Sequence, residues 1–201
     1  MRADQSPAEA IAKLKEGNRR YTTGNPQHPV HTPARRTELA KSQHPFAIIL
    51  SCSDSRVPSE IVFDQGIGDL FIVRVAGNVI NDEGLGSIEY AVEYLETRLI
   101  VVMGHQRCGA VQASKEIIAA NGVAPGHIES LVRAIKPAVE STANCDLDTT
   151  IKANVKHVVD CLRSSTPILK RKIDSGQVQV IGGYYSLDTG SVSFLDDVAI
   201  R

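Results

Sequence analysis

The feature that most constrains the fold of this chain is a series of short apolar runs that alternate with longer helical stretches. Four runs have the length of β-strands, and three of them are apolar nearly throughout: residues 46–51, 70–75, 99–105 and 177–184. Continuous apolarity is typical of parallel strands that helices cover on both faces. The sequence therefore predicts an α/β protein, with an open, mostly parallel sheet and crossover helices.

The stretches around these strands predict six helices and one more strand. The helices are expected over residues 58–64, 82–96, 109–120, 128–140, 148–164 and 167–175. A run over 191–195 follows Asp188-Thr189-Gly190 closely enough to form a hairpin with the fourth strand. We expect it to be an antiparallel strand at the edge of the sheet, beside four parallel strands.

The amino-terminal segment predicts a helical arm. Ser6-Pro7-Ala8-Glu9 is a capping box with proline at the first helical position, and this helix should end near Gly24. A second helix is expected from Thr32-Pro33 toward Ser42. We therefore predict a single domain over residues 1–201, with a helical arm at 1–43 and an α/β core at 44–201.

Composition excludes two classes of partner. The chain has 22 lysines and arginines against 23 acidic residues, so it lacks the positive field that gathers nucleic acid. Its longest apolar runs are of strand length and too short to cross a bilayer. The polar start at Met1 does not resemble a signal sequence, so we expect a cytoplasmic protein. A leader removed before Met1 would leave the same sequence.

Two cysteines and a histidine follow strands of the predicted sheet. Cys52 comes directly after the first strand, His105 ends the third, and Cys108 lies three residues further on. Ligands collect beyond the carboxyl ends of parallel strands, where the winding reverses. Two thiols and one imidazole suit zinc, and three protein ligands are typical of a catalytic site with an open position. Cys108 also precedes a predicted helix, whose positive end would favour its thiolate.

Asp54 and Arg56 share the first motif with Cys52. If this segment is extended, residues 52, 54 and 56 point to one face, so that both charged side chains lie beside the metal ligand. An Arg56 fork would hold the Asp54 carboxylate ionised and aim it. We hypothesise that Asp54 then orients the nucleophile.

Ordinary structural roles compete with each of these interpretations. An isolated His-x-x-Cys is a weak signal, and Cys52 could be a buried thiol at a strand end. Asp54 and Arg56 could form an ion pair that caps a helix starting at Pro58. For Cys145 and Cys161, which have no ligand spacing, packing is the preferred interpretation.

Taken together, these residues resemble the β-class carbonic anhydrases. The shared features are Cys-x-Asp-x-Arg at 52–56, His-x-x-Cys about fifty residues later, and the runs at 74–78 and 86–90, within a match over residues 6 to 120. The resemblance implies four parallel strands with one antiparallel edge strand, and one Zn²⁺ per subunit held by Cys52, His105 and Cys108. It also implies an obligatory homodimer, possibly paired into a tetramer, with the arm reaching across the partner and the active-site cleft at the interface.

The resemblance is closest to the plant-like subtype, which has an open zinc site. Gln43, Phe71 and Tyr90 correspond to its substrate-binding cleft residues, the glutamine as an amide donor and the aromatics as an apolar wall. The other subtype carries a tryptophan near the first strand as part of an inhibitory bicarbonate site. This sequence has no tryptophan, and Ile49 stands at the equivalent place.

The implied activity is reversible hydration of carbon dioxide to bicarbonate and a proton, by attack of zinc-bound hydroxide. Two alternatives remain open. One is hydrolysis of carbonyl sulfide or carbon disulfide by the same ligands. The other is a structural or regulatory zinc protein without turnover, in which Asp54 or another fourth ligand closes the metal site.

Overall fold

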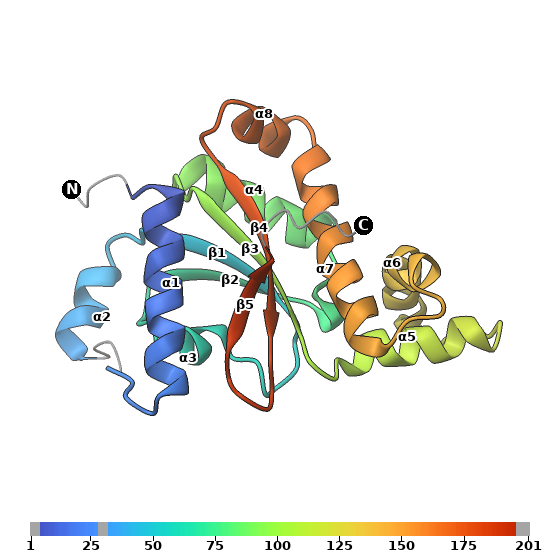
Figure 1. Ribbon diagram of the computed structural model, residues 1–201. Helices are drawn as coiled ribbons and strands as arrows, with labels where there is room; N and C mark the ends of the chain where they lie inside the picture. The colour runs from blue at the N-terminus through green and yellow to red at the C-terminus, as the bar shows by residue number, and fades with distance from the viewer. Residues whose placement is uncertain (1–4, 28–31, 196–201) are drawn as a thin grey trace.

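The computed structural model describes residues 5–27 and 32–195, and a five-stranded sheet is its centre (Figure 1). The strand order is β2-β1-β3-β4-β5, in which the first four strands run parallel and β5 is antiparallel to β4. The strands are β1 (Ala47–Ser51), β2 (Leu70–Arg74), β3 (Leu99–His105), β4 (Gln179–Tyr185) and β5 (Val192–Leu195). The predicted fold class is therefore confirmed, including the antiparallel edge strand.

Eight α-helices and one 3₁₀ turn surround this sheet in the described ranges. They are α1 (Pro7–Thr22), α2 (Pro33–Leu39), α3 (Ser59–Val62), η1 (Ala76–Asn78), α4 (Asp82–Tyr94), α5 (Gly109–Ala119), α6 (Ile128–Ser141), α7 (Leu147–Ser164) and α8 (Ile168–Asp174). Most bounds lie within two residues of the prediction. The helix expected over 58–64 is only four residues long, because Asp64 has a left-handed backbone with a φ of 46°.

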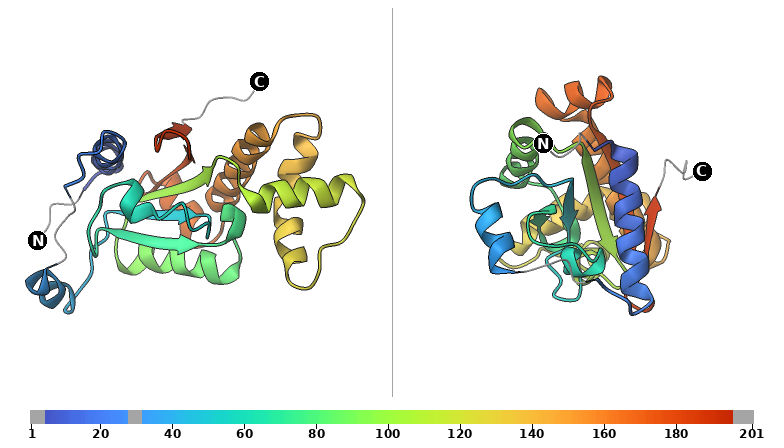
Figure 2. Two further views of the ribbon diagram at one scale, coloured as in Figure 1. Left: turned by 90° about the horizontal axis from the view of Figure 1, so that it is seen from below. Right: turned by 90° about the vertical axis from the view of Figure 1, so that its left-hand side faces the viewer.

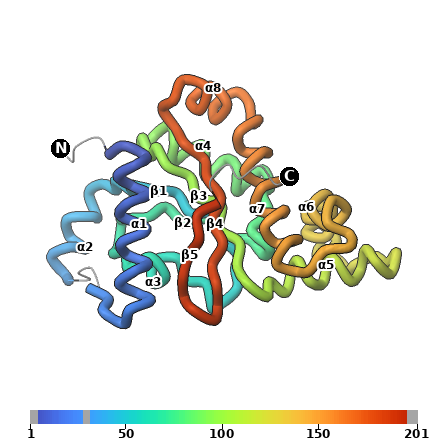
Figure 3. The backbone as a smooth tube through the Cα atoms, in the orientation of Figure 1, coloured from blue at the N-terminus to red at the C-terminus, as the bar shows by residue number. Residues whose placement is uncertain are grey.

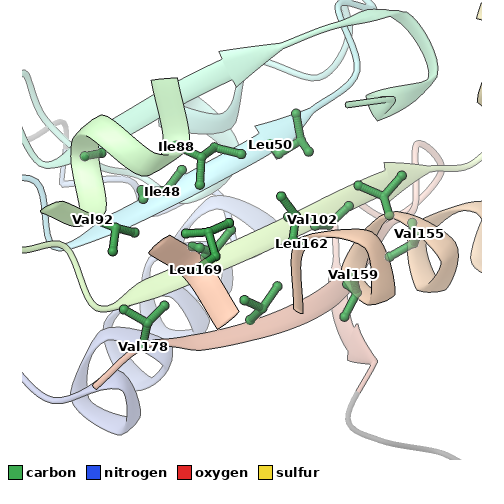
Figure 4. Packing of buried hydrophobic residues seen from close by; sticks show 14 residues of the cluster. Ile48, Leu50, Ile88, Val92, Val102, Val155, Val159, Leu162, Leu169 and Val178 are labelled. Atoms are coloured by element: carbon green, nitrogen blue, oxygen red, sulfur yellow. The ribbon is translucent and has the colours of Figure 1, made fainter. Parts of the chain in front are cut away.

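Helices cover both faces of the sheet, which explains the continuous apolar runs. Ile48 and Leu50 of β1 pack into the cluster beneath α4 and α7, together with Ile88 (Figure 4). The residue between them, Ile49, packs into the cluster beneath α1 on the opposite face. Figure 2 shows α1 and α4 on the two sides of the sheet. Because alternate side chains of a strand point to opposite faces, a strand buried on both faces must be apolar at every position.

Helix α1, the first part of the expected arm, packs into the core of its own chain. Leu14 is fully buried against the sheet. The side chain of Asn18 donates to the carbonyl oxygens of Val62 at 3.0 Å and Gly190 at 2.8 Å, and accepts from the amide of Val192 at 2.9 Å. Amphipathic spacing shows that a helix needs a partner, but it does not identify the partner. Helix α2, in contrast, buries no residue.

We expect Asn18→Ala to lower the free energy of unfolding by about 3 kcal/mol, because the carbonyls of Val62 and Gly190 and the amide of Val192 lose their partner. Denaturant unfolding monitored by circular dichroism measures the change. Asn25→Ala is the matched control, since Asn25 is exposed just beyond the same helix, and it should change stability by less than about 0.5 kcal/mol. Equal losses in the two variants would contradict the anchoring role of Asn18.

Candidate metal centre

Three potential metal ligands meet at the carboxyl edge of the sheet, where the strand order changes direction. Strand β2 lies on one side of β1 and β3 on the other. Cys52 follows β1 and His105 ends β3, so both residues lie at the junction of these neighbouring strands. Cys108 precedes α5, which leaves this edge together with α6 (Figure 3). The chain therefore places all three at the crevice that parallel sheets use for ligands.

The ligand atoms of Cys52, His105 and Cys108 lie within 4.8 Å of one another, and all three residues are buried. The His105 Nδ1 atom is 3.0 Å from the carbonyl oxygen of Gln106. A carbonyl can only accept, so Nδ1 carries the proton and Nε2 keeps its lone pair. That Nε2 atom is buried without a hydrogen-bond partner in the described part of the chain. Two sulfurs and one free imidazole nitrogen form a donor set that fits zinc.

The two thiols are electrostatically coupled. The neighbouring Cys108 thiol and the Gly77 amide, which donates to the Cys52 sulfur, lower the pKa of Cys52. The pKa of Cys108 is raised by its interaction with the Cys52 thiol, by burial and by the negative charge of that neighbour. The amides of Ala110 and Val111 at the start of α5 favour the Cys108 thiolate, as expected, but they do not outweigh the first two causes. The pKa values of the two thiols are thus shifted in opposite directions.

Asp54 lies beside these ligands in a turn. The Val57 amide donates to the Asp54 carbonyl at 3.0 Å, so the segment is not extended as expected. The Asp54 carboxylate accepts from Arg56 three times: from the backbone amide and Nε at 2.9 Å, and from Nη2 at 2.7 Å. These bonds are the main reason why the pKa of Asp54 is lowered to about 2. Its Oδ2 atom is 3.8 Å from the His105 Nε2.

The capping alternative for this pair does not hold. Helix α3 begins after Pro58 without any side-chain hydrogen bond at its cap. The carboxylate of Asp54 instead faces Arg56 and the imidazole of His105. A fixed anion next to a metal donor set can accept a proton or orient a water molecule.

Two residues that support the ligand segments were not predicted from the sequence. Arg74, at the end of β2, donates to the carbonyl oxygens of Cys52 at 3.1 Å and Asp54 at 2.7 Å. The position of Arg74, a cationic residue at the end of a predicted strand, could have indicated that it lies near the ligand segments. Asp188 binds Arg107, between the ligands His105 and Cys108, at 2.7 and 3.1 Å. No sequence signal links Asp188 to a residue more than eighty positions away.

The structure does not bring the expected cleft residues to the metal centre of the same chain. Gln43 and Tyr90 line a groove of about 770 Å³, together with residues 39–42, 67–68 and 94–96. No metal ligand is among the described residues that line this groove. Tyr90 is 47% exposed, and its ring centroid lies 5.4 Å from that of Tyr94. Phe71 is partly buried in β2 and packs against the core on the α4 side.

The remaining cysteines lie outside this centre. Cys145 is exposed, and the Cys161 Sγ atom is 3.7 Å from the His157 Nε2. Neither belongs to a group of three or more potential ligands in the ranges that the structure describes. Among the helices of those same ranges, none combines the length and the apolarity that crossing a bilayer would require.

Known proteins with similar sequences and structures point to one family. The sequence model of the carbonic anhydrase family matches residues 47–192. Carbonic anhydrase 2 of Mycobacterium tuberculosis H37Rv is 40% identical over 196 residues, which cover 96% of this chain and 95% of that protein. The carbonic anhydrase of Mycolicibacterium smegmatis is 37% identical over 201 residues, with 97% and 98% covered.

Two solved structures share the fold. The β-carbonic anhydrase CcaA superposes with a TM-score of 0.76 at 23% identity, covering 95% of this chain and 97% of its own. The β-carbonic anhydrase CafA of Aspergillus fumigatus has a TM-score of 0.70 at 27% identity, with 94% and 90% covered.

Proposed function

Because this chain belongs to the β-class carbonic anhydrases, we propose that it hydrates carbon dioxide reversibly at a zinc ion held by Cys52, His105 and Cys108. The observation that carries the proposal is the buried His105 Nε2 atom, which has no hydrogen-bond partner among the described residues and lies close to two thiols. A buried polar atom is costly unless something binds it. A zinc ion in this place supplies a Lewis acid that makes water nucleophilic near neutral pH.

The residues around the ligands have separate roles in this proposal. Arg56 holds the Asp54 carboxylate with a two-pronged ion pair. The Oδ2 atom of Asp54 accepts one of these bonds and keeps a lone pair on the side of His105. It accepts a hydrogen bond from the attacking water, which turns an oxygen lone pair toward the carbon of the substrate. Asp54 is thus a catalytic residue, and Arg56 is a positioning residue.

We further propose a homodimer in which each subunit completes the cleft of its partner. Gln43 and Tyr90 line a groove that contains no metal ligand of their own chain, yet the family places such residues in the active-site cleft. Their surroundings are apolar and exposed, with Tyr94 at 75% and Ile67 at 41% exposure. Phe71 would join them from β2. An apolar pocket with one amide donor suits carbon dioxide, which is small and uncharged.

A zinc determination and a stopped-flow assay of carbon dioxide hydration on the same sample test the proposed activity. Hydration that depends on one zinc per subunit supports it. Full hydration by a metal-free preparation would contradict it. Zinc without turnover would instead indicate a structural site, and turnover of carbonyl sulfide or carbon disulfide alone would indicate the related hydrolase.

Mixed dimers test the shared cleft. We expect Gln43→Ala/Tyr90→Ala and His105→Ala to be poorly active alone, and to recover about one quarter of parental activity when refolded together in equal amounts. Half of the dimers are then mixed, and each mixed dimer has one intact cleft. Stopped-flow hydration measures the recovery.

A second mixture serves as the control. His105→Ala with Cys52→Ser should recover nothing, because both changes damage the metal centre within one chain. If the first mixture also recovers nothing, Gln43 and Tyr90 contribute to the active site of their own subunit or to neither active site. The shared cleft would then be wrong.

A further inference from the structure

A buried asparagine on α7 is connected to the metal centre through one backbone residue. Asn154 is fully buried, and its Nδ2 atom donates to the carbonyl oxygen of Gly77 at 2.8 Å. The amide of the same glycine donates to the Cys52 Sγ atom at 3.2 Å. Two hydrogen bonds therefore lead from the middle of α7 to a metal ligand, across 77 positions of sequence.

The backbone at Gly77 does not hold this geometry by itself. Gly77 has a φ of 69°, and the next residue, Asn78, has a φ of 46°. Glycine adopts this region freely, so its backbone does not select the conformation by itself, and the left-handed Asn78 is held by its surroundings. A Cβ atom at Gly77 would lie 2.8 Å from the Ile135 Cδ1 and 3.3 Å from the Ala110 Cβ, so the position has room for glycine alone. The side-chain amide of Asn154 is the partner that satisfies the buried Gly77 carbonyl.

If Asn154 served only to fill space in the core, it would cost more free energy than an apolar side chain. Its Oδ1 atom is buried with no partner in the described ranges. A leucine, which has the same branched shape, would carry no such penalty. The residue that follows, Val155, already supplies apolar contact with the sheet. What asparagine provides at this position, and an apolar residue would not, is the hydrogen bond from its side-chain amide to the Gly77 carbonyl.

We propose that Asn154 is a positioning residue of the metal centre, which acts through Gly77 to aim a backbone N–H at the Cys52 sulfur. The inference rests on the proposed function, because it requires a metal on that sulfur. An N–H···S hydrogen bond withdraws charge from a thiolate, so the sulfur becomes a weaker donor and the metal a stronger Lewis acid. The same bond restricts the direction in which the sulfur presents its lone pair.

Cobalt(II) substitution of the full-length protein tests this role, since thiolate-to-cobalt charge-transfer bands report the charge on sulfur. We expect Asn154→Leu to shift these bands to longer wavelength, because the sulfur regains charge. The loss of the fixed lone-pair direction should outweigh this gain in donor strength, so that cobalt binding weakens about 10-fold in a competition with a chelator. Thr150→Val is the matched control. Thr150 is equally buried one turn earlier on α7, but its hydroxyl binds Thr142 and Asp146 rather than Gly77. This variant should keep the parental bands and affinity.

The outcomes separate the inference from the proposed function. Parental bands and affinity in Asn154→Leu, or equal shifts in both variants, would overturn the role of Asn154 alone. A parent without thiolate-to-cobalt bands would overturn the metal centre and this role together.

A measurement on the parent protein covers the case in which Asn154→Leu does not fold. With ¹¹³Cd in the site and ¹⁵N in the backbone, a scalar coupling between the metal and the Gly77 amide proton is expected across the hydrogen bond. Its absence in the loaded parent would show that the Gly77 amide does not reach the sulfur, and would overturn the inference.

Discussion

Cys52→Ser, His105→Ala and Cys108→Ser are each expected to lose both bound zinc and carbon dioxide hydration, down to the limit of detection. The three ligands are buried at one point, so the loss of one leaves only two of the three donors there. No other described residue is grouped with them as a potential ligand. Zinc content and stopped-flow hydration, measured on each folded variant, give the result.

Cys145→Ser is the control for the thiol substitutions. Cys145 is exposed and lies outside the cluster, so this variant should keep parental zinc and parental turnover. A structural zinc would also be lost from the ligand variants, which is why both quantities must be measured. A ligand variant that loses zinc and still turns over at the parental rate would refute the proposed mechanism.

Asp54→Asn is expected to keep zinc and to lower the turnover number about 100-fold or more. An amide has the shape of the carboxylate, but it loses the charge that Arg56 holds and that the attacking water needs as acceptor. Because this interaction acts mainly in the transition state, kcat and kcat/KM should fall together. Stopped-flow kinetics on zinc-loaded protein measure both constants.

Arg56→Ala should cause a similar loss indirectly, since it frees the Asp54 carboxylate from its ion pair. Arg19→Ala is a matched control, because Arg19 also makes a two-pronged bond to a carboxylate, that of Glu16, on the surface of α1. It should leave both kinetic constants unchanged. Parental kinetics in Asp54→Asn and Arg56→Ala would show that the pair is structural.

The sheet and the ligand set were predictable because both depend on short stretches of sequence. A strand buried on two faces is apolar at each position, as at Ile48 and Ile49, and this pattern needs no knowledge of the partner. Once the strands were in place, Cys52 and His105 had to lie at the same edge. Parallel strands end together.

Other features depend on contacts that no local pattern records. The docking of α1 relies on Asn18, whose partners lie more than forty and more than 170 positions away. The turn at Asp54 arises from its own side chain bonding to the Arg56 amide, a conformation that competes with extension. The link between Asn154 and Gly77 requires the exact packing of α7 against η1.

The position of the ligands at the junction of β1 and β3 has a consequence for folding as well as for chemistry. A metal ion held by Cys52 and His105 cross-links two segments that are separated by roughly fifty residues, and closing such a loop restricts the unfolded chain. A ligand that binds only the folded chain also stabilises it by mass action. If zinc is scarce, the amount of folded protein would therefore fall along with the activity. The same metal–ligand bonds would hold the catalytic ion and link the two strands.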